Sequence, residues 1–199
     1  MFESYLLSRP WLVAAIWAVL YASDYYLTIW GAKLREAQSV WGSGDSYELT
    51  PRYQKDIDRK RLVSPRFVIL LVCASVVLIV MGHTTEGSRE GYGFLVGVFL
   101  LPELLVHKRH LSNILFFKEI LRSNSSVSGM IRVKRHAVYR QSATEFAAYA
   151  VISLLLFAVA DSYILLGGAF VLGILACQQF GYARREKRKA TPIPQDAAD

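Results

Sequence analysis

The sequence predicts an all-α fold, a polytopic transmembrane helical bundle of about five spans with the N-terminus outside and the C-terminus in the cytoplasm. Of the 199 residues, 53% are hydrophobic and the mean hydropathy is +0.29, yet the net charge is +7. The charged residues fall in blocks between long apolar runs, which is typical of a membrane bundle rather than a globular core. We expect one helical domain at residues 1–182, followed by a tail at 183–199 that is first basic and then disordered.

Five apolar segments are each close to the ~20 residues that a helix needs to cross ~30 Å of hydrocarbon. The predicted spans are residues 11–32, 65–82, 91–107, 144–160 and 163–180. Spans two to four are slightly short, so we expect their helices to extend into the loops. The first segment has the length of a signal-peptide core, but Glu3 precedes it instead of a positive cluster, and we interpret it as a retained anchor.

The distribution of Lys and Arg predicts the orientation. Segments Lys33–Arg66 and Lys108–Arg140 carry eight each and the residues after Ala183 carry five, whereas the other side has only Arg9 and Arg89. The positive-inside rule places the basic side in the cytoplasm, and only an odd number of spans fits this pattern. We therefore expect a multi-pass protein of the cytoplasmic (inner) membrane.

The predicted cytoplasmic loops are residues 33–64 and 108–143. In the second loop, residues 111–121 place apolar side chains on one helical face, so we expect the third helix to continue or to bend onto the membrane surface. Further on, a basic amphipathic stretch suits the headgroups of anionic lipid, to which each cation near the surface contributes ~1 kcal/mol. Its predicted lipid-binding residues are Arg132, Lys134 and Arg135. A solvated loop that obeys the positive-inside rule explains them equally well.

An acidic residue interrupts the third span. Glu103 follows Pro102 within apolar sequence, and a carboxylate in hydrocarbon is costly. At about 100° per residue, Glu103, His107 and His110 lie within about 60° of one another on one helical face. Pro102 removes a backbone hydrogen bond in the same turn and predicts a kink or a loosened turn. We expect this polar face to point into the bundle.

The first span carries a matching polar stripe, which includes Tyr21, Asp24 and Thr28. Asp24 is expected at nearly the same depth as Glu103, in the inner half of the membrane. The sequence therefore predicts that the two acids face each other across a shared cavity that opens inward. Two adjacent carboxylates cannot both ionise without cost, so we expect a proton or a cation to compensate, and the histidines of the third span are the nearest such groups.

Three interpretations of this predicted site remain open. The first is a metal ion held by Glu103 with His107, or by His107 with His110, together with a further ligand, although no strong metal signature is present. The second is proton or ion handling, for which intramembrane carboxylates and histidines are the usual materials. The third is structural: Glu103 pairs with a basic side chain such as Arg66 or Lys108, and the histidines lie among the headgroups.

Small residues predict close packing of the third and fifth spans. Gly93 and Gly97 form a Gly-x-x-x-Gly motif, and Ala169, Gly173 and Cys177 form a small-residue ridge. Such residues allow two helix backbones to approach closely, within the bundle or between protomers.

These features predict an integral membrane protein that binds or conducts a small solute, an ion or a proton, as a homo-oligomer or as a subunit of a larger complex. One alternative is an intramembrane enzyme, with or without a metal, that acts on a lipid or another membrane substrate. Another is a membrane scaffold that recruits anionic lipid or a cytoplasmic partner. We expect no cofactor other than a metal ion, and no nucleic-acid partner, because the topology already explains the basic charge.

Overall fold

The computed structural model describes residues 2–36, 61–84, 88–122 and 134–189, and within these ranges all regular structure is helical. The helices are α1 (Phe2–Leu7), α2 (Pro10–Glu36), α4 (Pro65–Thr84), α5 (Arg89–Arg122), α6 (Arg135–Ala160) and α7 (Tyr163–Lys189). All except the short α1 are long and apolar enough to cross a membrane. The prediction of a helical chain with five membrane-spanning candidates is confirmed.

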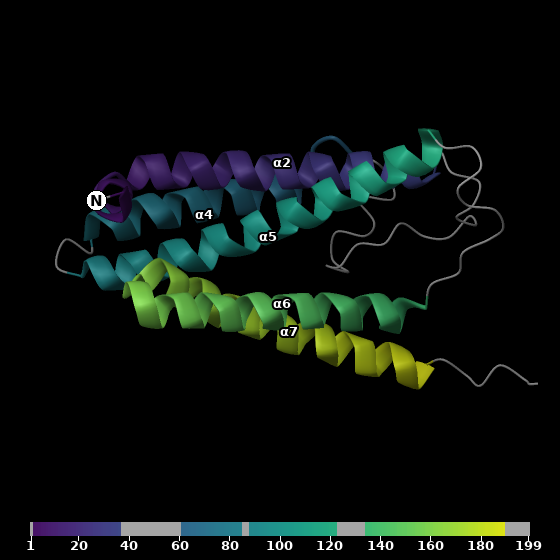
Figure 1. Cartoon of the computed structure of the whole chain (residues 1–199). Coiled ribbons are helices and arrows are strands. Elements are labelled where there is room, and N and C mark those ends of the chain that lie inside the picture. The colour runs from purple at the N-terminus through teal and green to yellow at the C-terminus, as the bar shows by residue number, and fades with distance from the viewer. Residues whose placement is uncertain (1, 37–60, 85–87, 123–133, 190–199) are drawn as a thin grey trace, which may run out of the picture.

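Consecutive long helices run in opposite directions, so the bundle has two distinct ends (Figure 1). The N-terminus and the turn between α6 and α7 lie at one end. The other end holds the last residues of α2, α5 and α7 and the first residues of α4 and α6, and we call it the basic end. Its described cations include Lys33, Arg66, Arg122, Arg135 and Lys189. This arrangement agrees with loops that alternate between two sides, while the direction of insertion stays a prediction.

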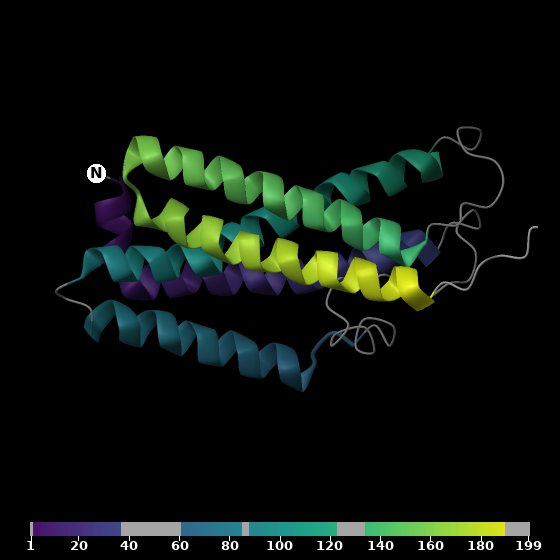
Figure 2. The same cartoon turned by 90° about the horizontal axis from the view of Figure 1, so that it is seen from below.

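Helix α5 joins two parts of the bundle. It packs on α7, which also pairs with α6, and on α2, which also pairs with α4. From the end that holds the N-terminus, α5 starts beside the α6–α7 pair and leans toward α2 at the basic end (Figures 1 and 2). Helix α5 therefore contacts α7 mainly through its first half and contacts α2 through both halves.

The crossing of α5 and α7 is a contact between backbones. A Cβ atom on Gly97 would lie 1.9 Å from the carbonyl oxygen of Ile164, and one on Gly167 would lie 1.9 Å from that of Phe94. The close approach therefore uses Gly97 of the predicted motif and a glycine of α7 outside the predicted ridge. Gly173 of that ridge has open space around it.

The largest apolar core fills the half of the bundle away from the basic end. It lies between α1, the first half of α2, the second half of α4 and the first half of α5, and its buried members are Leu6, Val13, Ala14, Trp17, Ala74, Leu78, Tyr92, Val96 and Leu100. The outer faces of α4 and α6 instead expose many Val, Leu and Ile side chains. Such apolar outer surfaces suit contact with lipid.

Several helices extend beyond the predicted spans. Helix α5 continues through Pro102 to Arg122, so residues 108–122 lengthen the third helix, which was one of the two outcomes expected for them. The extension lies against α2, where the Lys118 ammonium is 4.7 Å from the centre of the Trp30 ring.

Helices α6 and α7 are also longer than their predicted spans. Helix α6 begins at Arg135, and α7 continues to Lys189, so the start of the expected tail is helical; residues 190–199 lie outside the described ranges. The rings of Tyr139 and Tyr182, 5.5 Å apart, hold these two extensions together.

Candidate functional site

Polar side chains of α2 and α5 meet in the half of the bundle nearer the basic end. The Oδ1 atom of Asp24 lies 2.9 Å from Nε2 of His110, and the same nitrogen lies 3.1 Å from Oγ1 of Thr28. One turn earlier on α5, Nε2 of His107 lies 2.6 Å from Oγ of Ser23. We call this group the α2–α5 polar cluster, and its members are Ser23, Asp24, Thr28, Glu103, His107 and His110.

The hydrogen bonds around His110 fix the position of one proton. The Thr28 hydroxyl donates its proton to the backbone carbonyl of Asp24 at 3.0 Å. Because that hydroxyl has no second proton, Nε2 of His110 is the donor toward Thr28 in this arrangement, and His110 is either the neutral Nε2–H tautomer or the imidazolium. Its approach to Oδ1 of Asp24 has the distance of an ion pair, but that oxygen has no hydrogen-bond partner among the described residues.

His107 keeps its hydrogen bonds in either charge state. Its Nδ1 lies 2.7 Å from the carbonyl oxygen of Glu103, which can only accept, so Nδ1 is a donor. The Ser23 hydroxyl lies 2.9 Å from the carbonyl oxygen of Leu20 and 2.6 Å from Nε2 of His107. When Nε2 carries a proton, it donates to Ser23 and Ser23 donates to Leu20. When Nε2 is bare, the hydroxyl can turn and donate to it.

Glu103 adds a half-buried carboxylate on the same face of α5. Its Oε2 atom is shielded from solvent and has no hydrogen-bond partner among the described residues. The carboxylate also lies within electrostatic range of Asp24. An enclosed carboxylate without a donor is costly to keep charged, because burial removes the water that would stabilise it. Oδ1 of Asp24 is shielded and without a hydrogen-bond partner among the described residues in the same way, so both acids of the cluster would be stabilised by a proton or a cation.

The structure brings together most of the predicted site residues and adds one. Asp24, Thr28, His107 and His110 make direct contacts between α2 and α5. Ser23 is an unpredicted member, although small hydroxyl side chains in membrane spans often bind across helix interfaces.

Tyr21, which was predicted to line the cavity, has its ring in an aromatic stack. The ring centroid lies 5.0 Å from that of Trp17 and 5.4 Å from that of Phe67. This stack lies beside the polar cluster on the α4 side, so Tyr21 contributes apolar packing there.

The metal interpretation receives no further support from the geometry. Within the described ranges, no three His, Cys, Asp or Glu side chains gather as a metal site would require. Both ring nitrogens of His107 contact protein groups, and its contact with Glu103 is through the backbone carbonyl. A bound metal ion stays a prediction.

The predicted lipid-binding residues lie at the basic end. Lys134 and Arg135 are exposed at the start of α6, and Arg132 lies outside the described residues. Their binding to anionic lipid stays a prediction.

A second polar contact joins α5 to α6. The Nε atom of Arg109 lies 3.2 Å from Oε2 of Glu145, and its Nη2 donates to Oγ of the buried Ser142 at 2.9 Å. The guanidinium also lies over the Phe146 ring, 5.8 Å from its centre. This contact lies on the α6 side of α5, whereas the histidines of the polar cluster contact α2.

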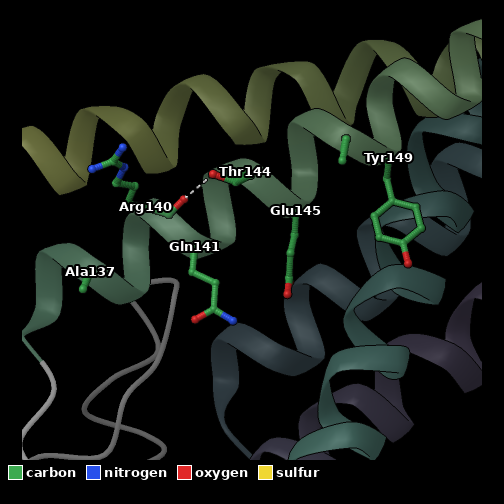
Figure 3. A pocket seen from close by; sticks show the side chains of 7 residues that line it. Ala137, Arg140, Gln141, Thr144, Glu145 and Tyr149 are labelled. Atoms are coloured by element: carbon green, nitrogen blue, oxygen red, sulfur yellow. Dashed lines mark hydrogen bonds between the residues drawn. The ribbon is translucent and has the colours of Figure 1, made fainter.

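Glu145 also borders an open groove of about 500 Å³ on α6. In Figure 3, the side chains of Gln141, Glu145 and Tyr149 point to the same side of the helix, whereas the guanidinium of Arg140 points away from them. The groove contains no residue of the α2–α5 polar cluster. It is therefore distinct from the inward-facing cavity that the sequence predicts, and that cavity stays a prediction.

No protein family, curated protein or solved structure matches this chain.

Proposed function

We propose that the chain is an integral membrane protein of the cytoplasmic membrane that binds protons at the α2–α5 polar cluster, and that it delivers or conducts them as a homo-oligomer or as a subunit of a larger complex. The observation that carries the proposal is the half-buried Glu103 carboxylate, whose shielded Oε2 atom has no hydrogen-bond partner among the described residues.

The charges of the cluster support this proposal. Asp24 and Glu103 together contribute two negative charges when both are ionised, and the two histidines contribute two positive charges when both are protonated. Arg109, the nearest arginine on α5, is already paired with Glu145. Protons alone can therefore bring the cluster from a net charge of about −2 to neutrality, and a low-dielectric interior favours the neutral state.

The contact distances favour a proton over a larger ligand. The histidines touch Ser23, Asp24 and Thr28 directly, at 2.6 to 3.1 Å. A solute or a hydrated ion between these side chains would have to separate α2 from α5. A proton requires no such movement, since His107 retains its bond to Ser23 in both charge states.

Infrared difference spectroscopy of the protein in lipid tests the proposal between about pH 5 and pH 8, the range in which histidine side chains change charge. We expect a carboxyl C=O band that changes with pH and is lost in Glu103→Gln. Glu90→Gln is the matched control, because Glu90 lies on the same helix but is exposed, and it should leave this band intact.

The proposal fails if no pH-dependent band is lost in Glu103→Gln while the variant is inserted and folded. Asp24→Asn provides a second check, because it removes the negative charge beside Glu103 and the partner of His110. It should shift the pH at which the band changes, whereas a cluster without a role in proton binding would respond to neither substitution.

A further inference from the structure

We propose that protons reach the α2–α5 polar cluster only from the basic end of the bundle, so that the cluster is the closed inner end of a half-channel. This inference depends on the proposed function for its ligand, but the access route can be tested separately. It follows from what lies on either side of the cluster along α2 and α5.

Toward the basic end, the polar groups of the cluster extend from Glu103 to His110 on α5 and from Asp24 to Thr28 on α2, and the His110 and Asp24 side chains are 21% and 24% exposed. Beyond them, Ile29 of α2 and Ile114 of α5 are buried. On α5, His107 and His110 follow Glu103 at intervals of four and three residues, which is about 6 Å and about 4.5 Å along a helix axis. On α2, Asp24 and Thr28 provide the facing polar groups, and the Tyr25 hydroxyl, one residue after Asp24, donates to the carbonyl of Arg61 at 2.7 Å. Each step is short enough for transfer through a hydroxyl, an imidazole or one water molecule.

In the other direction, the same interface becomes apolar at once. The buried side chains that precede Glu103 on α5 and Ser23 on α2 belong to the largest core cluster. We call them the apolar seal, and its members are Val13, Trp17, Tyr92, Val96 and Leu100. Val13 and Val96 have no exposed surface.

The seal is thick and closely packed. Tyr92 and Glu103 are eleven residues apart on α5, which corresponds to about 17 Å of helix. Trp17 spans the interface, with its ring stacked on Tyr21 and edge-on to Phe99 at 5.6 Å. The layer holds two polar side-chain groups, the indole N–H of Trp17 and the Tyr92 hydroxyl, and the hydroxyl is buried without a hydrogen-bond partner among the described residues. A proton has no continuous hydrogen-bonded route through such a layer.

The charge of His107 depends on the polar and charged groups that surround it. From α2 it faces Ser23 and Asp24, and its own helix supplies Glu103 and His110. On its other side, α5 packs on α6 and α7, which contribute Phe146, Leu172 and Ala176 around Leu105. The cations that follow His107 on α5 are Lys108, which is exposed, and Arg109, which is paired with Glu145. The protonation of the cluster should therefore follow the pH of the compartment at the basic end.

Site-directed labelling in proteoliposomes tests the access route without reference to protons. The background carries Cys73→Ser and Cys177→Ser, since both native thiols are exposed. Single cysteines then replace Ser23 or Thr28 in the cluster, and Ala14 in the core. Ser88→Cys and Lys189→Cys mark the two ends of the bundle, and a charged, membrane-impermeant thiol reagent is added to one face at a time.

We expect Ser23→Cys and Thr28→Cys to react only from the face on which Lys189→Cys reacts, and Ala14→Cys to react from neither. Labelling of Ser23→Cys from the Ser88 face, from both faces or from neither would overturn the proposal. The tryptophan fluorescence of each variant, compared with that of the cysteine-free background, checks that the fold is retained. One-sided labelling without a pH-dependent Glu103 band would support the access route and reject the proposed proton binding. Failure of the access route can therefore be distinguished from failure of the proposed function.

Discussion

The backbone contact between α5 and α7 leads to a sharp prediction for Gly97→Ala. The new methyl group would start 1.9 Å from the carbonyl oxygen of Ile164, 2.7 Å from its carbonyl carbon and 2.9 Å from the amide nitrogen of Gly168. All three are backbone atoms, so no side-chain rotation can relieve the clash. To reach an ordinary contact of 3.4 Å, the two helices must separate locally by 1.5 Å.

The cost of this separation exceeds the gain from helix propensity. Replacing Gly by Ala inside a helix stabilises it by about 1 kcal/mol. Overpacking of a well-packed interface costs about 1–3 kcal/mol, and here the displaced backbones also lose dispersion contacts along the crossing. We therefore expect Gly97→Ala to lower the free energy of unfolding by up to about 2 kcal/mol. Gly167→Ala, which would meet the carbonyl of Phe94 at the same distance, should behave similarly.

The assay is unfolding by sodium dodecyl sulfate in mild detergent micelles, followed by tryptophan fluorescence. Gly173→Ala is the matched control, because it lies on α7 with nothing within 4 Å of the added methyl group. It should unfold at the same or a slightly higher fraction of denaturing detergent. If Gly97→Ala and Gly173→Ala unfold together, the crossing is not as close as described and the argument from backbone contact is wrong.

Three further outcomes follow from other parts of the bundle. Ser64→Ala removes the hydroxyl that accepts a hydrogen bond from the Phe67 amide at the start of α4, and should lower the free energy of unfolding by about 0.5–2 kcal/mol in the same assay. Ser88→Thr keeps a hydroxyl at the start of α5 and should cost less. Asp161 has a φ of 49° in the turn between α6 and α7, so Asp161→Gly should be tolerated and Asp161→Val should destabilise; equal stability of the two would contradict the turn geometry. Cysteine accessibility should place residues 43 and 126 on the cytoplasmic side and residue 88 outside, and finding residues 43 and 88 on one side would end the five-span arrangement.

The helices could be predicted from the sequence because each crossing needs a long apolar segment. The ends of the helices could be predicted less well from the sequence. Hydropathy falls at Lys108, for example, but the helix does not end there. The extension of α5 is held by a tertiary contact, the Lys118 ammonium on the Trp30 ring, which no local pattern reveals.

The facing of Asp24 and His110 could be predicted in part from helical periodicity and depth, since both residues lie on polar faces in the same half of the membrane. Ser23 was not predicted because it lies beside the narrow polar stripe of α2 that includes Asp24. The contact with α5 is wider than this stripe and includes both Ser23 and Asp24. Similarly, Gly97 was found as a packing residue, but its partner Gly167 was not, because the pairing of two helices is a tertiary property.

The long sequence separation within the α2–α5 polar cluster has a consequence for how the chain is made. Ser23 and His107 are 84 residues apart, and a ribosome needs about 4–17 s to add that many residues. During this interval α2 has left the ribosome but the imidazoles that bind Ser23 and Asp24 have not been synthesised. A lone aspartate at the centre of a span costs about 2.5–3.5 kcal/mol on insertion scales. Until α5 is made, α2 therefore carries the cost of Asp24 without the imidazole that faces it in the finished bundle.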